Sequence, residues 1–102
     1  MICFIVLFTL KTRSEENIAY VQQCIMQLEE SINVLKSMEV GTNLHLTNRS
    51  SDIVAIFNFE TMEDLHLFED DAEHIRIVEL IKPFVAEIKT VIYKKITNKD
   101  HI

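Results

Sequence analysis

Few side chains in this sequence of 102 residues could carry out acid–base chemistry. A histidine titrates near neutrality and can act as a general base, and His45, His66 and His74 offer this chemistry. Their spacing is not that of metal ligands such as H-x-x-x-H, so we expect no metal site. We expect His45 and His66 to be exposed polar positions. Three roles remain open for His74: a tether that hydrogen-bonds a helix start to a strand backbone, a ligand contact, or a catalytic base.

The remaining polar motifs predict no further chemistry. Tyr20 and Tyr93 could reach a cavity or its rim, but we expect neither to be catalytic. The single glycine is isolated, so there is no glycine-rich phosphate loop, and no nucleophile elbow is present. The acidic run 69–73 predicts a helix end followed by a new N-cap, because a cation site needs more converging oxygen ligands. We therefore expect no cofactor.

Charge and apolar run lengths restrict the classes of partner. The net charge of −6 repels phosphate backbones, so we expect no nucleic-acid partner. The longest apolar run, residues 1–10, is too short to span a membrane and does not have the pattern of a signal peptide. We expect a cytoplasmic protein, in which Cys3 and Cys24 are free thiols packed in the core.

The first half of the chain predicts a strand, a helix and a hairpin. Residues 1–10 are apolar on both alternating faces, which is typical of a strand buried on both sides. Ser14 is a candidate N-cap, and apolar residues then recur every three or four positions as far as Leu35, which predicts a helix. Residues 36–46 and 52–60 are predicted to form two strands around a polar turn.

The second half of the chain predicts two helical pieces and a final strand. Thr61 is a candidate N-cap, with Asp64 in the third position of a capping box. A second helical stripe begins at His74, and Pro83 should disturb its last turn. Residues 88–96 are predicted to form the last strand. We expect one domain over residues 1–97 and a short C-terminal tail over 98–102.

This β-α-β-β-α-β order predicts an α+β fold of the ferredoxin-like type, with one antiparallel sheet and helices on one face. The other sheet face is expected to remain open and apolar. A soluble monomer does not tolerate such a patch, so we expect a homodimer that packs sheet against sheet. The residues expected on this open face are Phe4, Val6, Phe8, Ile53, Ala55 and Phe57.

Several segments resemble the stress-responsive dimeric α/β-barrel (Dabb) family. The most specific are the I-V-L-F strand, the E-V-G turn, F-E-T-M-E-D-L, and the helix from His74 into the I-K-P segment. The resemblance covers residues 1 to about 94. It implies a homodimer in which two four-stranded sheets close a barrel with a cavity in each half.

The chain is also similar to plant polyketide cyclases of this type, and this likeness implies where an active site would lie. Their cavity carries a histidine on the first strand, a histidine on the third strand, and a tyrosine paired with a histidine on the second helix. This sequence has Phe4, Ile53 and Phe68 at the first three positions, and only His74 matches. Asp71 and Ala72 replace a common His-Pro pair. The departures remove the polar partners that would orient a base.

We therefore predict that the protein binds a small apolar or aromatic molecule in the barrel without converting it. The predicted cavity lining is Phe4, Val6, Phe8, Ile53, Ala55, Phe57 and Phe68. One alternative is a barrel completely filled by these side chains, with a role in protein interaction only. The other is an enzyme that uses His74, either a polyketide cyclase or a cofactor-free monooxygenase.

Overall fold

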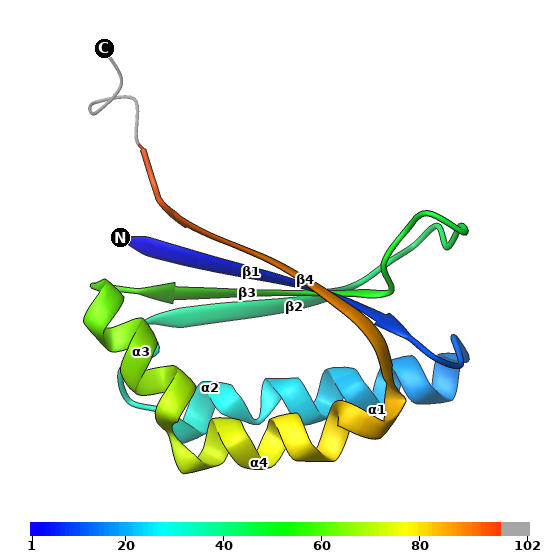
Figure 1. The fold of residues 1–102 in the computed structure, drawn as a ribbon, viewed down its shortest axis with the longest axis horizontal. Coiled ribbons are helices and arrows are strands. Elements are labelled where there is room, and N and C mark those ends of the chain that lie inside the picture. Colours follow the sequence, from blue (N-terminus) through cyan, green and yellow to red (C-terminus); the bar gives the residue numbers. More distant parts are fainter. Residues whose placement is uncertain (97–102) are drawn as a thin grey trace.

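The fold is one antiparallel sheet with all of its helices on one face (Figure 1). The computed structural model describes residues 1–96. The sheet has the strand order β2-β3-β1-β4, with β1 Ile2–Leu10, β2 Ser37–Thr42, β3 Ile53–Phe59 and β4 Val85–Lys94. The helices are α1 Glu15–Met26, α2 Leu28–Ser31, α3 Met62–Asp70 and α4 Ala72–Ile81, followed by the 3-10 turn η1 Lys82–Phe84. The predicted ferredoxin-like α+β fold is confirmed.

The helix starts follow the predicted capping. The Ser14 hydroxyl accepts a hydrogen bond from the backbone N–H of Asn17, and the Thr61 hydroxyl accepts one from Asp64. Asp71 ends α3, and its carboxylate accepts a bond from the N–H of Glu73 at the start of α4. These oxygens satisfy N–H groups that have no partner inside the helix. The acidic run is therefore a helix end followed by a new N-cap, as predicted.

Three element boundaries differ from the prediction by three residues or more. The first helix stops at Met26, and the buried Ile32 follows a separate short turn of helix, α2. Strand β2 ends at Thr42, because the chain beyond it leaves the sheet and Leu44 is 99% exposed. Strand β4 begins earlier than predicted, because Pro83 lies in the 3-10 turn that ends the α4 helical segment.

The prediction for the open sheet face is wrong. Phe4, Val6 and Phe8 lie on the helix-covered face, where Val6 and Phe8 belong to the same buried cluster as Val21 and Ile25 of α1. Ile53, Ala55 and Phe57 of β3 belong to the same buried core. Since alternate residues point to opposite faces, the open face carries the other set. Its aliphatic members are Ile5, Leu7, Val54, Ile56 and Val91, and Cys3 and Tyr93 lie on the same face.

A buried ion pair fixes the β2–β3 loop to the end of β1. Asp52 is fully buried, and its carboxylate accepts hydrogen bonds from the Leu10 backbone N–H at 2.7 Å and from Arg13 Nε at 2.6 Å. The Arg13 guanidinium also donates to the carbonyl oxygens of Thr47 and Ser50. A buried carboxylate requires such partners, because desolvation would otherwise penalise its charge. Arg13 thereby holds the whole loop against the body of the domain.

No helix within residues 1–96 is long and apolar enough to cross a membrane. Cys3 and Cys24 are free and buried, as the sequence predicts. The predicted tail, residues 98–102, lies outside the described residues.

Candidate functional site

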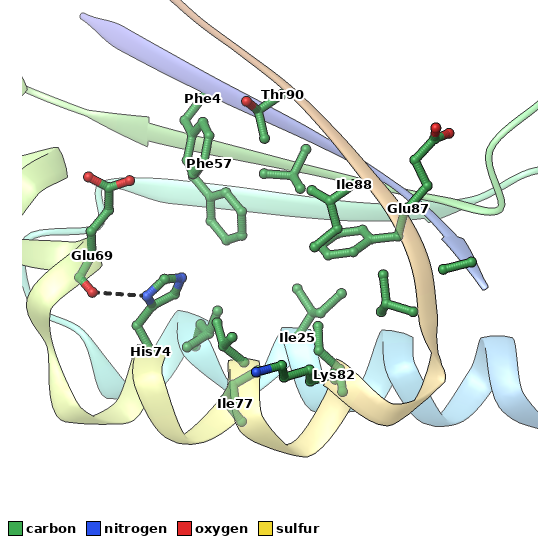
Figure 2. Close-up of a pocket in the computed structure, with 17 residues that line it drawn as sticks. Phe4, Ile25, Phe57, Glu69, His74, Ile77, Lys82, Glu87, Ile88 and Thr90 are labelled. Atoms are coloured by element: carbon green, nitrogen blue, oxygen red, sulfur yellow. Dashed lines mark hydrogen bonds between the residues drawn. The ribbon is translucent and has the colours of Figure 1, made fainter. Parts of the chain in front are cut away.

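The main cavity lies between the sheet and α4 (Figure 2) and has a volume of about 560 Å3. Apolar side chains make up most of its lining, with charged groups at the edges. The lining consists of Phe4, Val6, Phe8, Ile25, Leu28, Phe57, Glu69, His74, Ile77, Val78, Ile81, Lys82, Val85, Ala86, Glu87, Ile88 and Thr90. A cavity of this size falls in the range of small-molecule sites, which are mostly apolar with a few polar groups.

The course of β4 opens this cavity. The strand rises from the helix layer at Val85 to the sheet (Figure 1), and its pairing with β1 is irregular between Thr9 and Leu10. Its helix-side residues are therefore not covered by α4, and Ile88 is 51% exposed. Val78 of α4 also lines the cavity and is 39% exposed. The cavity is thus accessible from solvent between β4 and α4.

His74 is held from two sides at one end of the cavity. Its Nδ1 lies 3.2 Å from the carbonyl oxygen of Glu69, in the last turn of α3. Its ring packs on Phe68, with ring centroids 4.6 Å apart and planes inclined by 41°. Phe68 is fully buried and contacts Phe57 and Phe59 with centroid distances of 5.1 Å in both cases. The imidazole therefore has a fixed place, and its tether is a helix carbonyl instead of the predicted strand backbone.

Negatively charged groups outnumber positively charged ones in the cavity lining. The lining includes the carboxylates of Glu69 and Glu87 and one ammonium group, that of Lys82. The carboxylate of Glu69 also lies 3.5 Å from Nδ1 of His66, which is exposed as predicted. Among residues 1–96, no group of three or more His, Cys, Asp or Glu side chains is arranged to hold a metal ion.

The structure brings together part of the predicted lining. Phe4, Val6, Phe8 and Phe57 line the cavity, but it is enclosed by the sheet and helices of one chain and not by the open face. The other three predicted residues, Ile53, Ala55 and Phe68, lie in the packed core without lining it. The contributions of α1, α4 and β4 to the lining were not predicted from the sequence. The regular stripe through Ile77, Val78 and Ile81 was a signal for the contribution of α4, but such a stripe is equally typical of a core-facing helix.

The two tyrosines do not line the cavity. Tyr20 packs on Phe84 with ring centroids 5.1 Å apart. A hydrogen bond with the Cys24 thiol, and charge repulsion once that thiol is ionised, raise the pKa of Tyr20 above its ordinary value. The Cys3 thiol raises the pKa of Tyr93 by the same two effects. Both phenols are therefore favoured in their neutral form.

The protein is therefore a ferredoxin-like α+β protein with a cavity of small-molecule size between its sheet and α4. The family model of the stress-responsive A/B barrel domain (Dabb) matches residues 3–94. The chain belongs to the Dabb family, as its sequence motifs indicated. No curated protein matches the sequence at a significant level.

Solved structures of the same fold come from several organisms. A dimeric protein of unknown function with a ferredoxin-like fold from Bacteroides fragilis has 21% identity and a TM-score of 0.77, over 92% of this chain and 95% of that one. A Dabb family protein with a ferredoxin-like fold from Mesorhizobium loti has 16% identity and a TM-score of 0.80, over 94% and 97%. A hydroxynitrile lyase from Passiflora edulis has 16% identity and a TM-score of 0.77, over 90% of each chain. Likenesses at these identities establish the shared fold.

Proposed function

We propose that the protein is a homodimeric binding protein for a small apolar or aromatic molecule. The observation that carries this proposal is the cavity of about 560 Å3 between the sheet and α4, with its mostly apolar lining and accessible mouth. The site proposed from the sequence thus moves from the open sheet face to the helix side. The free thiols of Cys3 and Cys24 favour a cytoplasmic setting, where thiols stay reduced.

The apolar lining supplies enough free energy for modest affinity. An aromatic group the size of a phenylalanine side chain buries roughly 200 Å2. At about 25 cal/mol per Å2, this burial contributes about 5 kcal/mol. Association costs part of this free energy, because the ligand loses translational and rotational freedom. A dissociation constant of a few hundred micromolar is therefore the tightest binding that one such ring supplies by burial alone. A larger ligand that fills more of the cavity binds more tightly.

Titration with a hydrophobic fluorophore tests the proposal. Val78→Trp places a bulky ring at the cavity mouth and should weaken binding at least tenfold. Ile75→Trp on the same helix is the matched control, because Ile75 is 52% exposed and does not line the cavity. Saturable binding that Val78→Trp reduces and Ile75→Trp leaves unchanged supports the site. No saturable binding to the wild type would favour the interaction-only alternative.

The homodimer in this proposal rests on the open sheet face. Leu7 and Val91, which are 37% and 50% exposed, lie there beside the half-buried Ile5, Val54 and Ile56. A contiguous apolar surface of this kind marks a protein interface, and a two-fold pairing of the two sheets covers it on both copies. The Bacteroides fragilis protein of the same fold is described as dimeric, which supports a homodimer here.

An enzyme that uses His74 is the second candidate. The observation that favours it is an imidazole held at the end of an apolar cavity, where a general base would meet a bound substrate. Phe68, which packs on the ring, and Phe4, which lines the same cavity, have no polar group to orient the imidazole or to stabilise developing charge. A panel of linear polyketide mimics provides the test: cyclisation that disappears in His74→Ala would replace the binding proposal with a catalytic one.

A further inference from the structure

We propose that the cavity selects a neutral phenol, whose hydroxyl donates a hydrogen bond to Nε2 of His74 while its apolar body fills the cavity. This inference rests on the proposed binding function and specifies the chemistry of its ligand. Its basis is the hydrogen bond that His74 makes on the opposite side of its ring.

The contact with Glu69 determines which nitrogen of His74 carries the proton. A backbone carbonyl oxygen can only accept a hydrogen bond, so the 3.2 Å contact with Nδ1 requires the proton on Nδ1. A neutral imidazole has one donor and one acceptor nitrogen. In the neutral ring, Nε2 is therefore a hydrogen-bond acceptor, and a ligand can pair with it only by presenting an O–H or N–H group.

The acceptor nitrogen faces the cavity. Figure 2 shows the ring of His74 with one nitrogen toward Glu69 and the other toward the interior, on the side of Phe57. Within residues 1–96, no protein group forms a hydrogen bond with Nε2. The packing of the ring on Phe68 and the Glu69 contact hold this orientation. The Nε2 atom of His74 is therefore a hydrogen-bond acceptor with a fixed orientation at one end of a mostly apolar cavity.

The lining around this acceptor favours an aromatic body over an alkyl one. Phe4 and Phe57 lie with ring centroids 5.9 Å apart on the sheet side, and both line the cavity. Such rings gain additional stabilisation from a ligand ring packed at their edge or face. A phenolic hydroxyl also keeps its proton at neutral pH, since its pKa is about 10. Phenols combine these two properties, the apolar ring and the neutral donor.

The charges around the cavity favour a neutral ligand over an anion. The ionisable groups that line it, besides His74, are Glu69 from α3, Lys82 from the turn after α4, and Glu87 from β4. Two carboxylates and one ammonium give the rim a net negative charge. An aromatic carboxylate would meet repulsion there, and it has no proton to donate to Nε2 at neutral pH.

Calorimetric titration with matched ligands tests the inference. The probes are 4-propylphenol and its methyl ether, 4-propylanisole, which has the same ring but cannot donate. The wild type should bind the phenol about tenfold more tightly, because the ether leaves the Nε2 acceptor unpaired. The extra methyl group of the ether adds apolar area and would by itself favour the ether. His74→Phe keeps a ring of similar shape and should bind the ether at least as tightly as the phenol, whereas His45→Phe in the exposed loop should keep the preference for the phenol.

Each outcome decides a separate point. Equal affinity of the wild type for the two probes would overturn the phenol inference and leave the binding function standing. No saturable binding of either probe would overturn both. The tautomer can be read without any variant from the ring-nitrogen chemical shifts of 15N-labelled protein at neutral pH. A neutral His74 with its proton on Nε2 would overturn the inference.

Discussion

The clearest stability prediction concerns the buried carboxylate of Asp52. Asp52→Ala removes an acceptor from the buried N–H of Leu10 and from Arg13 Nε. Hydrogen bonds to a charged group contribute about 1.5–3 kcal/mol each, and breaking a buried ion pair costs about 3–5 kcal/mol. The Arg13 side chain is 28% exposed and keeps its bonds to Thr47 and Ser50, which reduces its share of the loss. We therefore expect a loss of about 3 kcal/mol.

The matched control is the other ion pair that joins residues distant in sequence within the described part of the chain. Lys36 and Glu60 lie 3.0 Å apart, but their side chains are 50% and 59% exposed. Exposed pairs of this kind contribute roughly 0–1 kcal/mol, because solvent screens them. Glu60→Ala should therefore change the free energy of unfolding by less than about 1 kcal/mol.

Urea unfolding followed by far-ultraviolet circular dichroism measures both variants, at one fixed protomer concentration because dimerisation would couple to folding. Asp52→Asn keeps an acceptor for Leu10 without the charge, so it should lose less than Asp52→Ala and remain measurable if the alanine variant fails to fold. In thermal melts, a loss of 3 kcal/mol corresponds to a decrease in Tm of about 12 °C or more. A change for Asp52→Ala no larger than that for Glu60→Ala would refute the assignment of a stabilising buried pair.

Three further predictions concern the core, the open face and the imidazole. Phe68→Ala removes the fully buried ring between His74, Phe57 and Phe59, and should lower the free energy of unfolding by about 3–5 kcal/mol in a denaturant titration; a loss below about 1.5 kcal/mol would contradict its central place. Leu7→Glu on the open face should convert the proposed dimer to a monomer in analytical ultracentrifugation, while Met26→Glu on α1 should not. A wild-type monomer at micromolar concentration would rule out the dimer. His74→Ala should keep the fold and lower the free energy of unfolding in urea by less than about 2 kcal/mol, because it removes one exposed hydrogen bond. A decrease of more than about 3 kcal/mol would instead assign His74 to a buried network.

The sequence could predict the order of elements but not the orientation of the sheet. Capping at Ser14 and Thr61 and the three-four spacing of apolar residues are local signals, so the helix starts were found within the sequence itself. Strand β1 is apolar on both faces, and alternation alone cannot say which face the helices cover. Phe4 and Ile5 are equally apolar neighbours, yet they point to opposite sides of the sheet.

The cavity and the ion pair depend on contacts between distant parts of the chain. Arg13 and Asp52 are 39 positions apart, and Asp52 stood in the sequence as an ordinary polar residue at the start of a strand. The cavity exists because β4 leaves the cover of α4 after Val85, and this path depends on tertiary packing. The stripe through Ile77 and Ile81 is compatible with either a filled core or a cavity floor, since both require apolar side chains.

The course of β4 has a consequence for self-association into fibrils. Within residues 1–96, the strand lies at the edge of the sheet and pairs with β1 alone, so one side of its backbone has no strand of this part of the chain beside it. Long, flat edges of this kind can template further strands, and twisting, irregular pairing and lysine side chains all oppose such growth. Strand β4 combines the irregular pairing at Thr9 and Leu10 with the exposed Lys89 and Lys94. The irregular course of β4, which opens the cavity to solvent, therefore also makes this sheet edge a poor template for amyloid-like stacking.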